Sequence, residues 1–492
     1  MQYNCLSVAI VAQQLPLCPP PPRVVGPVEF REFCARLDRL NALLRAGVDR
    51  EFVTRSVAYH CTQRRRPMTA AEQAAFQQES RVALRTTLAR VLLGESLRGF
   101  SCHLAESAVL QRFCGLGDLD RVVVPGHSQL QRYAGWLPVA DLRAVVIALV
   151  QQAAAADAPE LLGLADALSL ETVWVDTTCA ETHIHYPVDW LLLRDAVRTL
   201  IQAICVLRDH GLKHRMPTPV TFLTAMNTLA MRMTHVGRGP KGQARRKVVL
   251  REMTALVKTV QAHAERYVAL VEALPAPLGW AIAARRRMQL VLDQLPAVLH
   301  QAHERIIGER AVATAEKVLS LYEPDTAVIT RGKAGAQVEF GYTLLLAEQH
   351  DGLIVDWDLP RTPESDRDLL TAGVSRWQTA YPGAIHTAVT DRGFDGPDTR
   401  RTLTEAGIAD GMCPRSPRRL VERQQDPAFR AQQRRRAQTE GRIAIVKQTF
   451  LDGRLRTEGY AHHQVEVTWV VLAHNLWVLA RLPVARRQAL AA

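Results

Sequence analysis

The sequence lacks the cysteine pattern of a disulfide framework or of a zinc site with thiolate ligands. Its nine cysteines are an odd number, and no two of them form a C-x-x-C pair. Secreted folds that depend on disulfides and thiolate zinc domains are therefore excluded as interpretations. We expect reduced thiols in a cytoplasmic protein.

The sequence also lacks a membrane-spanning segment and the features of a secretory signal. No uninterrupted apolar run reaches the roughly 20 residues that a transmembrane helix needs. The N-terminal stretch MQYNCLSVAIVAQQLPLCPPPP has no basic residue ahead of its apolar part, which Gln13 and Gln14 interrupt. We therefore expect a soluble protein that is not exported.

What the sequence does contain is a large apolar fraction and a surplus of positive charge. Hydrophobic residues make up 48% of the 492 residues, which is enough for real cores and excludes general disorder. The 61 Lys and Arg residues outnumber the 49 Asp and Glu residues, which gives a net charge of +12. This surplus favours nucleic acid as a partner, because neutralised phosphates release their counterions. An ordinary basic surface has the same composition.

The order of the expected elements indicates the fold class. The stretch ETVWVDT at 171–177 has the composition of a strand, whereas residues 189–322 have an almost continuous helical pattern. The later expected strands are 337–348, 353–357, 385–391 and 408–413, and the later helices are 365–379, 397–406, 431–449 and 465–481. This order predicts an α/β fold, a mixed sheet flanked by helices and interrupted by a helical insertion, after an N-terminal helical region.

Three acidic residues fall where such a sheet would bring them together. Asp176 ends the first expected strand and Asp391 ends a later one, and side chains at strand ends gather at one edge of a sheet. Glu440 lies in the helix RRRAQTEGRIAIVK, with Arg436 four residues before it and Lys447 seven after it. This spacing places the three side chains on one helix face, where an acid between two cations suits both a metal ion and phosphates.

Each of these acids also has an ordinary structural interpretation. An Asp at the end of a strand commonly forms a turn or caps a helix. A helical Arg-x-x-x-Glu pair is usually an exposed ion pair of little energetic weight. Only the joint arrangement of the three acids in a basic chain favours a catalytic site.

Beyond the three acids, the chain contains a series of ordered segments: DTT at 176–178, ETHIHYP at 181–187, RGKAGAQVEFGY at 331–342, TDRGFDGPDTRRTL at 390–403, EGRIAIVKQTF at 440–450 and VVLAHNLWVLAR at 470–481. The helix around Glu440 contains the pattern R-x3-E-x6-K. These segments resemble transposases of bacterial insertion sequences, and the closest likeness is to the ISNCY-type group. The helical pattern is similar to the Y-x2-R-x3-E-x6-K pattern of those transposases, with Gln433 at the Tyr position.

The resemblance implies a ribonuclease H-like core in which Asp176, Asp391 and Glu440 hold catalytic Mg²⁺ or Mn²⁺. Carboxylate oxygens are the ligands that such hard cations prefer. Two ions would act on the scissile phosphate, one activating the attacking water or 3′-hydroxyl and the other stabilising the leaving oxygen. The resemblance therefore implies DNA cleavage followed by strand transfer.

The same resemblance implies DNA contacts near the cleaved strand. Arg436 and Lys447 would meet phosphates, the Arg as a fork of donors and the Lys as a point charge. We assign Arg392 and Lys333 as further DNA contacts, although an exposed loop lysine commonly has no such role. The partners implied are the terminal inverted repeats of the element, the target DNA, and a second copy of the chain in a homodimer or larger assembly.

The patterns and the resemblance together divide the chain into four expected parts. Within the N-terminal part, a helical stretch ends at Gly115 and Gly117, and a second helix begins with Ser128 as its N-cap. Two helices around a glycine turn fit a DNA-reading unit, and they fit an ordinary helical hairpin equally well. The parts are a leader at 1–27, a helical DNA-end-binding domain at 28–165, a ribonuclease H-like core at 166–188 and 325–482, and a helical insertion at 189–324.

Two other functions fit the same sequence. A metal-dependent nuclease on the same core would cut DNA without joining its ends. A non-catalytic derivative of a transposase would only bind DNA, and the presence of Asp176, Asp391 and Glu440 disfavours it. For a transposase we expect a cytoplasmic location in a bacterium, at the nucleoid.

Overall fold

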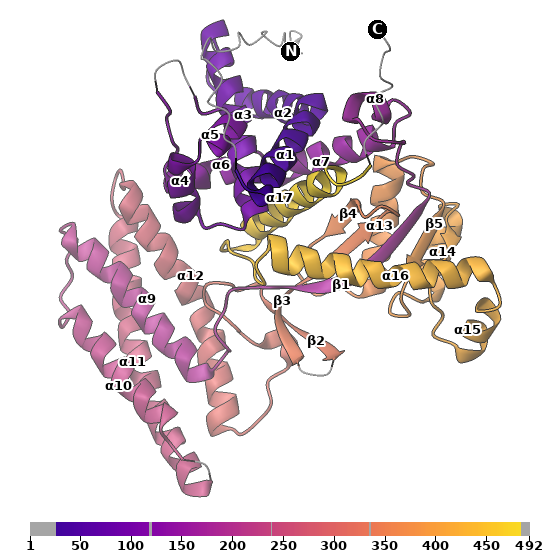
Figure 1. Ribbon diagram of the computed structural model, residues 1–492. Coiled ribbons are helices and arrows are strands. Elements are labelled where there is room, and N and C mark those ends of the chain that lie inside the picture. The colour runs from indigo at the N-terminus through magenta and orange to yellow at the C-terminus, as the bar shows by residue number, and fades with distance from the viewer. Residues whose placement is uncertain (1–25, 118–120, 238, 334–335, 484–492) are drawn as a thin grey trace, which may run out of the picture. The chain divides into compact units, whose positions relative to one another are not determined.

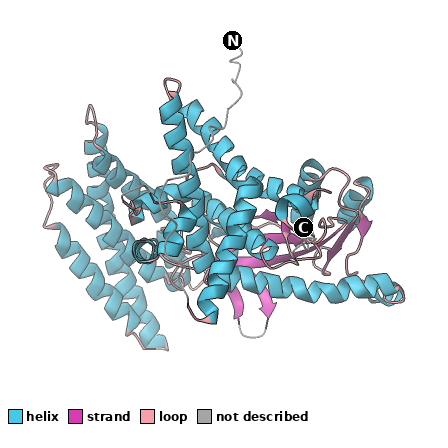
Figure 2. Ribbon diagram, turned by 45° about the horizontal axis from the view of Figure 1, so that its top comes forward, coloured by secondary structure: helices cyan, strands magenta, loops and turns pink. Residues whose placement is uncertain are grey.

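The computed structural model describes residues 26–117, 121–237, 239–333 and 336–483, without the side chains of 331–337. The expected leader thus lies almost wholly outside the described residues. The chain divides into two compact units, residues 1–180 with 343–492 and residues 181–342. The first unit includes both the N-terminal helices and most of the sheet, and the four expected domain boundaries stay a prediction. Figure 2 shows the strands gathered in one sheet among many helices.

The N-terminal region of the first unit is helical, as expected. Helix α3 begins at a capping box, in which Thr69 Oγ accepts from the Glu72 amide and the Glu72 carboxylate accepts from the Thr69 amide. The elements are α1 (Val28–Leu43), the π-helical turn η1 (Leu44–Val48), α2 (Asp49–Gln63), α3 (Ala70–Leu93), α4 (Leu97–Glu106), α5 (Ala108–Cys114), α6 (His127–Ala134), α7 (Val139–Ala154) and α8 (Ala158–Leu162).

The expected helix end at Gly115 is confirmed, but the expected cap at Ser128 is wrong. Gly115 follows α5 with a φ of +70°, a conformation that glycine adopts without strain. Helix α6 begins two residues earlier than a cap at Ser128 predicts, at His127, with Gly126 as its N-cap. Ser128 Oγ lies 3.3 Å from His127 Nε2 instead of capping the helix.

The mixed sheet that the sequence predicts is confirmed and has six strands. Its order is β2-β3-β1-β5-β6, and β4 pairs with β3. Strands β1, β5 and β6 are parallel neighbours, whereas β3 is antiparallel to β2 and β4. The strands are β1 (Thr172–Glu181), β2 (Ala327–Lys333), β3 (Ala336–Glu348), β4 (Ile354–Asp358), β5 (Thr387–Thr390) and β6 (Ala409–Asp410).

Two features of the sheet differ from the prediction. Strand β1 does not end at Asp176 but continues to Glu181, because Thr177, Thr178 and Cys179 extend a well-buried strand. Strand β2 was not expected at all, because only the short stretch Ala327–Thr330 has strand composition before the polar residues that follow. Strand β5 ends at Thr390, so Asp391 is the first residue beyond it.

The C-terminal helices of the first unit flank the sheet. Figure 1 shows α16 lying beside the strands β1 and β5. Helix α17 packs on α3 and α7, and its Trp469 Nε1 donates to the Ala134 carbonyl at 2.8 Å. The helices are α13 (Asp366–Ala380), α14 (Pro397–Glu405), α15 (Pro417–Arg423), α16 (Pro427–Ile445), the π-helical turn η4 (Val446–Phe450) and α17 (Tyr460–Leu479).

The second unit consists mainly of four long helices around their own apolar core. The apolar faces of α9, α11 and α12 form one continuous buried cluster, which includes Leu200, Tyr267 and Leu295. The helices are α9 (Asp189–Asp209), α10 (Pro219–Thr234), α11 (Pro240–Glu272), α12 (Gly279–Ala302), the π-helical turn η2 (His303–Ile307) and the 3₁₀ turn η3 (Thr314–Glu316).

No single helix among the described residues is long and apolar enough to cross a membrane, although α6 and α7 together, bent by 72°, pass the same test of length and composition.

Candidate active site

The register of the two central strands brings Asp176 and Asp391 side by side. Strands β1 and β5 are parallel, and Val175 pairs with Thr390. Asp176 and Asp391 are the next residues along the two chains, and neighbouring strands lie about 4.8 Å apart. The chain turns directly after β5, where Asp391 Oδ1 accepts a hydrogen bond of 2.8 Å from the Gly393 amide. The two strand acids therefore meet although only one of them stands at a strand end.

Arg436 connects the third acid to this pair. Its Nη1 lies 3.6 Å from Asp176 Oδ2, and its Nη2 lies 3.5 Å from Glu440 Oε1. Arg436 and Glu440 share one face of α16, as the four-residue spacing predicts. The Glu440 side chain is 59% exposed, compared with 17% for Asp176. Helix α16 thus brings Glu440 and Arg436 to the edge of the sheet where Asp176 lies.

Two side chains hold α16 against the strands that precede the acids. Trp174, two residues before Asp176, donates from Nε1 to the Gln432 carbonyl at 3.0 Å. Gln433 Nε2 donates to the carbonyls of Thr390 and Gly411 at 3.3 and 2.8 Å. Gln433, which departs from the Tyr of the similar motif, therefore anchors α16 beside the residue that precedes Asp391.

A buried carboxylate fixes a second face of the same helix. Glu348, 1% exposed at the end of β3, accepts at Oε1 from Arg435 Nη1 (2.9 Å) and Thr439 Oγ1 (2.7 Å). Its Oε2 accepts from Arg442 Nε at 3.1 Å. The Arg435 guanidinium also lies over the Trp174 ring, 4.7 Å from its centroid. These contacts set the rotation of α16, because Arg436 and Glu440 each follow one of the Glu348 ligands by one residue.

The electrostatics of Asp176 show that the three acids influence one another. Burial, together with the charges of Asp391 and Glu440, raises the pKa of Asp176 to about 6. The Thr177 amide, which donates to Asp176 Oδ1 at 2.8 Å, and the Arg436 guanidinium lower this pKa and only partly offset the increase. A carboxylate whose pKa is raised in this way binds a cation favourably, because the cation offsets the repulsion between the neighbouring carboxylates.

A fourth acid, which the sequence analysis missed, lies at the same place. Asp366, the first residue of α13, accepts a hydrogen bond of 2.9 Å at Oδ1 from Thr177 Oγ1. A Cβ added to Gly393 would meet Asp366 Oδ2 at 2.8 Å and Asp391 Oδ1 at 2.9 Å, so both carboxylates flank this glycine. Ser365 and Asp368 mark Asp366 as an ordinary helix start, and the sequence holds no signal that separates it from one.

The residues present fit a hard divalent cation by their chemistry but do not enclose one as they stand. Among the described residues, no three His, Cys, Asp or Glu side chains are close enough to hold one metal ion together. The Arg436 guanidinium stands at both Asp176 and Glu440. Three carboxylates are nevertheless the oxygen ligands that Mg²⁺ and Mn²⁺ take.

The other residues predicted to contact DNA lie in three different surroundings. Lys447 lies half-buried in η4, so the regular α-helical spacing that placed it on the face of Glu440 does not extend to it. Arg392 is exposed directly after Asp391, and its carbonyl accepts from Arg415 Nε at 2.8 Å. Lys333 ends β2, and its side chain lies outside the described residues.

Other acids near the site have structural partners. Asp395, four residues after Asp391, is buried, pairs with Arg400 and accepts from the Arg415 amide at 2.8 Å. Asp356 is 2% exposed and pairs with Arg143 and Arg376. Neither carboxylate is available to a ligand, which leaves Asp176, Asp391, Glu440 and Asp366 at the edge of the sheet.

The comparisons with known proteins assign a family to the part of the chain that contains Asp391 and Glu440. Residues 330–476 match the family described as the transposase DDE domain, a domain with a ribonuclease H-like fold. The match includes Asp391, Arg436 and Glu440 but begins after Asp176, so the place of Asp176 rests on the strand register. No curated protein matches the chain. No solved structure matches it either.

Proposed function

We propose that this chain, whose residues 330–476 match the transposase DDE domain, is a transposase that cleaves DNA at the ends of an insertion sequence and joins those ends to target DNA. The observation that carries the proposal is the meeting of acids from three separate elements. Besides burial, the charges of Asp391 after β5 and Glu440 on α16 raise the pKa of Asp176 on β1, and Arg436 lies against Asp176 and Glu440. Acids brought together from distant segments are typical of a metal-dependent phosphoryl-transfer site.

Asp176, Asp391 and Glu440 would hold Mg²⁺ or Mn²⁺. When bound, such ions neutralise phosphate charge and activate an oxygen nucleophile at neutral pH. Asp176 must lose its proton before it can bind such an ion, and it does so near pH 6, because burial raises its pKa to about 6. The Gly393 amide orients the Asp391 carboxylate by donating a hydrogen bond to Oδ1.

Arg436 has the chemistry of a phosphate ligand at this site. Its guanidinium already lies within 3.6 Å of Asp176 and 3.5 Å of Glu440, the carboxylates next to which the cleaved strand would lie. A planar guanidinium donates two parallel hydrogen bonds to a phosphate, a geometry that a lysine does not reproduce. Arg392, exposed beside Asp391, together with Lys447 and Lys333 are the further DNA contacts of the proposal.

The finer features of the proposal follow from the similarity to insertion-sequence transposases. The motifs of the chain resemble those of the ISNCY-type group, and we propose an element of that type. Because both ends of an element must be held during joining, we propose a homodimer or larger assembly on DNA. We also propose that the protein works at the bacterial nucleoid.

The test is a cleavage and strand-transfer assay with the purified full chain and duplex DNA that carries the ends of its own element. Mg²⁺ would be compared with EDTA, and the element ends with shuffled ends of equal length. Cleavage at the ends followed by joining to a target plasmid supports the transposase. Cleavage without joining replaces it with the nuclease, and end-specific binding without either reaction replaces it with the non-catalytic derivative.

A further inference from the structure

The second compact unit carries most of the chain's excess positive charge. Residues 189–324, which form its four long helices, contain 20 Lys and Arg against 11 Asp and Glu, a net charge of +9 out of +12 for the whole chain. None of the acids of the candidate active site lies in this segment. The basic character of the chain therefore belongs mainly to a region that the catalytic proposal does not use.

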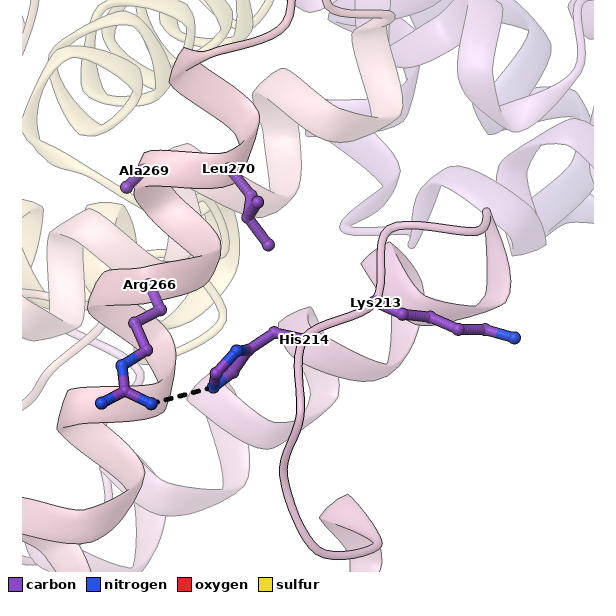
Figure 3. A pocket seen from close by; sticks show the side chains of 5 residues that line it. All are labelled: Lys213, His214, Arg266, Ala269 and Leu270. Atoms are coloured by element: carbon purple, nitrogen blue, oxygen red, sulfur yellow. Dashed lines mark hydrogen bonds between the residues drawn. The ribbon is translucent and has the colours of Figure 1, made fainter.

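A pocket of about 320 Å³ opens on this unit, between the loop after α9 and the last turns of α11. Figure 3 shows its lining side chains, Lys213 and His214 from the loop and Arg266, Ala269 and Leu270 from α11. Three of the five are basic, and no acidic residue of the described part of the chain lines it. Such a lining fits a negatively charged ligand.

The loop that supplies two of these residues is held in place by buried groups. Tyr267, fully buried, accepts at its hydroxyl from Arg208 Nη1 (2.9 Å) and from the His214 amide (3.3 Å). Arg208 Nη1 also donates to the His214 carbonyl at 3.1 Å. The backbone of the pocket is thus ordered without a ligand, which lowers the entropic cost of binding one.

The cations of the pocket lack the carboxylate partners that neighbouring cations have. In the same unit, Arg232 on α10 pairs with Glu252 at 2.6 Å and Arg285 on α12 pairs with Glu272 at 2.8 Å. The Arg266 guanidinium instead donates to His214 Nε2 at 3.1 Å (Figure 3). Among the described residues, no carboxylate forms an ion pair with Lys213 or Arg266.

The local potential is positive enough to affect a nearby histidine. Burial lowers the pKa of His263, and the charges of His214 and Arg266 lower it further. His263 Nδ1 is buried and has no hydrogen-bond partner among the described residues. An anion at the pocket would offset the repulsion between these groups.

A row of exposed cations on α11 leads to the pocket. Arg251, Lys258 and Arg266 are spaced by seven and eight residues, so they lie on one side of the helix with exposed alanines between them. At about 1.5 Å per residue the row is roughly 22 Å long. One acid, Glu265, stands on this side and accepts from Gln261 Nε2 at 2.8 Å. A row of this length fits an extended polyanion better than a single small anion.

We propose that the pocket at Lys213, His214 and Arg266, with the α11 row, binds the sugar-phosphate backbone of DNA at a contact separate from the three acids. This inference rests on the proposed function only in taking DNA as the ligand. Arg266 supplies the guanidinium donors, Lys213 adds a mobile charge at the rim, and Leu270 and Ala269 give an apolar wall. A contact of this kind positions DNA without reading its sequence.

The test measures the salt dependence of DNA binding by the full chain. A duplex is titrated at several salt concentrations, and log affinity is plotted against log salt. The double variant Lys213→Ala with Arg266→Ala is compared with Arg232→Ala with Arg285→Ala, which removes the same charge from ion-paired positions of the same unit. We expect the slope to shrink by about 2 for the first variant, one for each lost phosphate contact. For the control we expect the wild-type slope.

Equal slopes for both variants and wild type would overturn the inference. An equal loss of slope in both variants would also overturn it, because the effect would then follow from net charge alone and not from the pocket. The proposed function is judged by cleavage, not by these slopes. A wild type that binds through the pocket but neither cuts nor joins would refute the transposase activity and leave this contact standing.

Discussion

The guanidinium of Arg436 lies 3.6 Å from the carboxylate of Asp176, so a side chain of α16 reaches the acid of strand β1. The same guanidinium touches Glu440 at 3.5 Å. In this arrangement one cation offsets part of the repulsion within a group of acids. Burial and the remaining repulsion still leave Asp176 with a raised pKa, and the cost of ionising this carboxylate appears in the stability of the protein.

The first prediction concerns Asp176→Asn. The folded pKa of about 6 lies above the ordinary value of 3.8, so the folded state favours the protonated form. Below about pH 4 the carboxylate therefore does not lower the free energy of unfolding. Above about pH 6 its ionisation lowers that free energy in full, by on the order of 2 kcal/mol. We expect the substitution to raise the free energy of unfolding by about 1–2 kcal/mol at pH 7.5 and to leave it unchanged at pH 4.

Denaturant unfolding at the two pH values measures this effect. Asp398→Asn is the control, because that carboxylate is 78% exposed and pairs only with Arg401 on its own helix. A stability at pH 7.5 that falls in Asp176→Asn, or rises equally in the control, would contradict the prediction.

The second prediction uses Gly393 as a steric probe of the site. A methyl group there would meet the carboxylate oxygens of Asp366 and Asp391 at 2.8 and 2.9 Å, so both must move. We expect Gly393→Ala to lower the cleavage rate by about tenfold or more, because small displacements at a reacting centre are costly, while DNA binding persists. Gly441→Ala is the control: it follows Glu440, meets no atom within 4 Å, and should stabilise α16 by roughly 0.5–1 kcal/mol.

Single-turnover cleavage and DNA binding would be measured on both variants. Full cleavage by Gly393→Ala would show that the position of Asp366 and Asp391 is not critical. A comparable loss in Gly441→Ala would place the sensitivity in α16 instead.

The third prediction concerns Glu348, the buried carboxylate that receives Arg435, Thr439 and Arg442. Glu348→Gln would leave two guanidinium groups without their counter-charge in a buried place, at a cost of about 3–5 kcal/mol in the free energy of unfolding. Glu422→Gln is the control, because Glu422 is 60% exposed and pairs with Arg418 on the surface, where the loss should be within about 0.5 kcal/mol. Urea unfolding compares the two, and equal losses would show that Glu348 does not hold α16.

The fourth prediction concerns Gly352, in the turn between β3 and β4. Its φ of +96° strains any other residue, and an added Cβ would overlap the Arg442 guanidinium. Gly383 has a similar positive φ of +66° but no atom within 4 Å. Gly383→Ala should therefore cost only backbone strain, about 1 kcal/mol, whereas Gly352→Ala should cost clearly more. Thermal unfolding of both variants tests this, and equal shifts would contradict the role of the overlap.

Local patterns were sufficient for part of the fold and of the candidate site. The mixed sheet, the long helices of residues 189–322 and the four-residue spacing of Arg436 and Glu440 follow from periodicity, because each depends on neighbours in the chain. The course of β1 beyond Asp176 did not, since an Asp within a strand resembles a strand end when only the sequence is seen. Strand β1 continues past the last residue of β5 beside its other neighbour β3, and that is a long-range contact.

The contacts that hold the site together were beyond the reach of sequence reasoning. Glu348 reads as a residue at the end of a strand, and only the fold brings it to Arg435 and Arg442, about 90 residues later. Asp366 reads as the start of a helix, and its approach to Asp391 depends on the packing of α13 against the sheet. Gln433 seemed a departure from a motif, and the structure gives it two carbonyl partners.

The most direct test of the central claim is single-turnover cleavage of end-bearing DNA in Mg²⁺ by Asp176→Asn, Asp391→Asn and Glu440→Gln, with Asp395→Asn as a fourth variant. DNA binding is measured in parallel, so that a loss of cleavage is not mistaken for a loss of substrate. If the three acids form one catalytic centre, each of the first three variants binds DNA and fails to cleave, while Asp395→Asn cleaves in proportion to its folded fraction. Cleavage at the wild-type rate by any of the three would remove that residue from the centre and contradict the account.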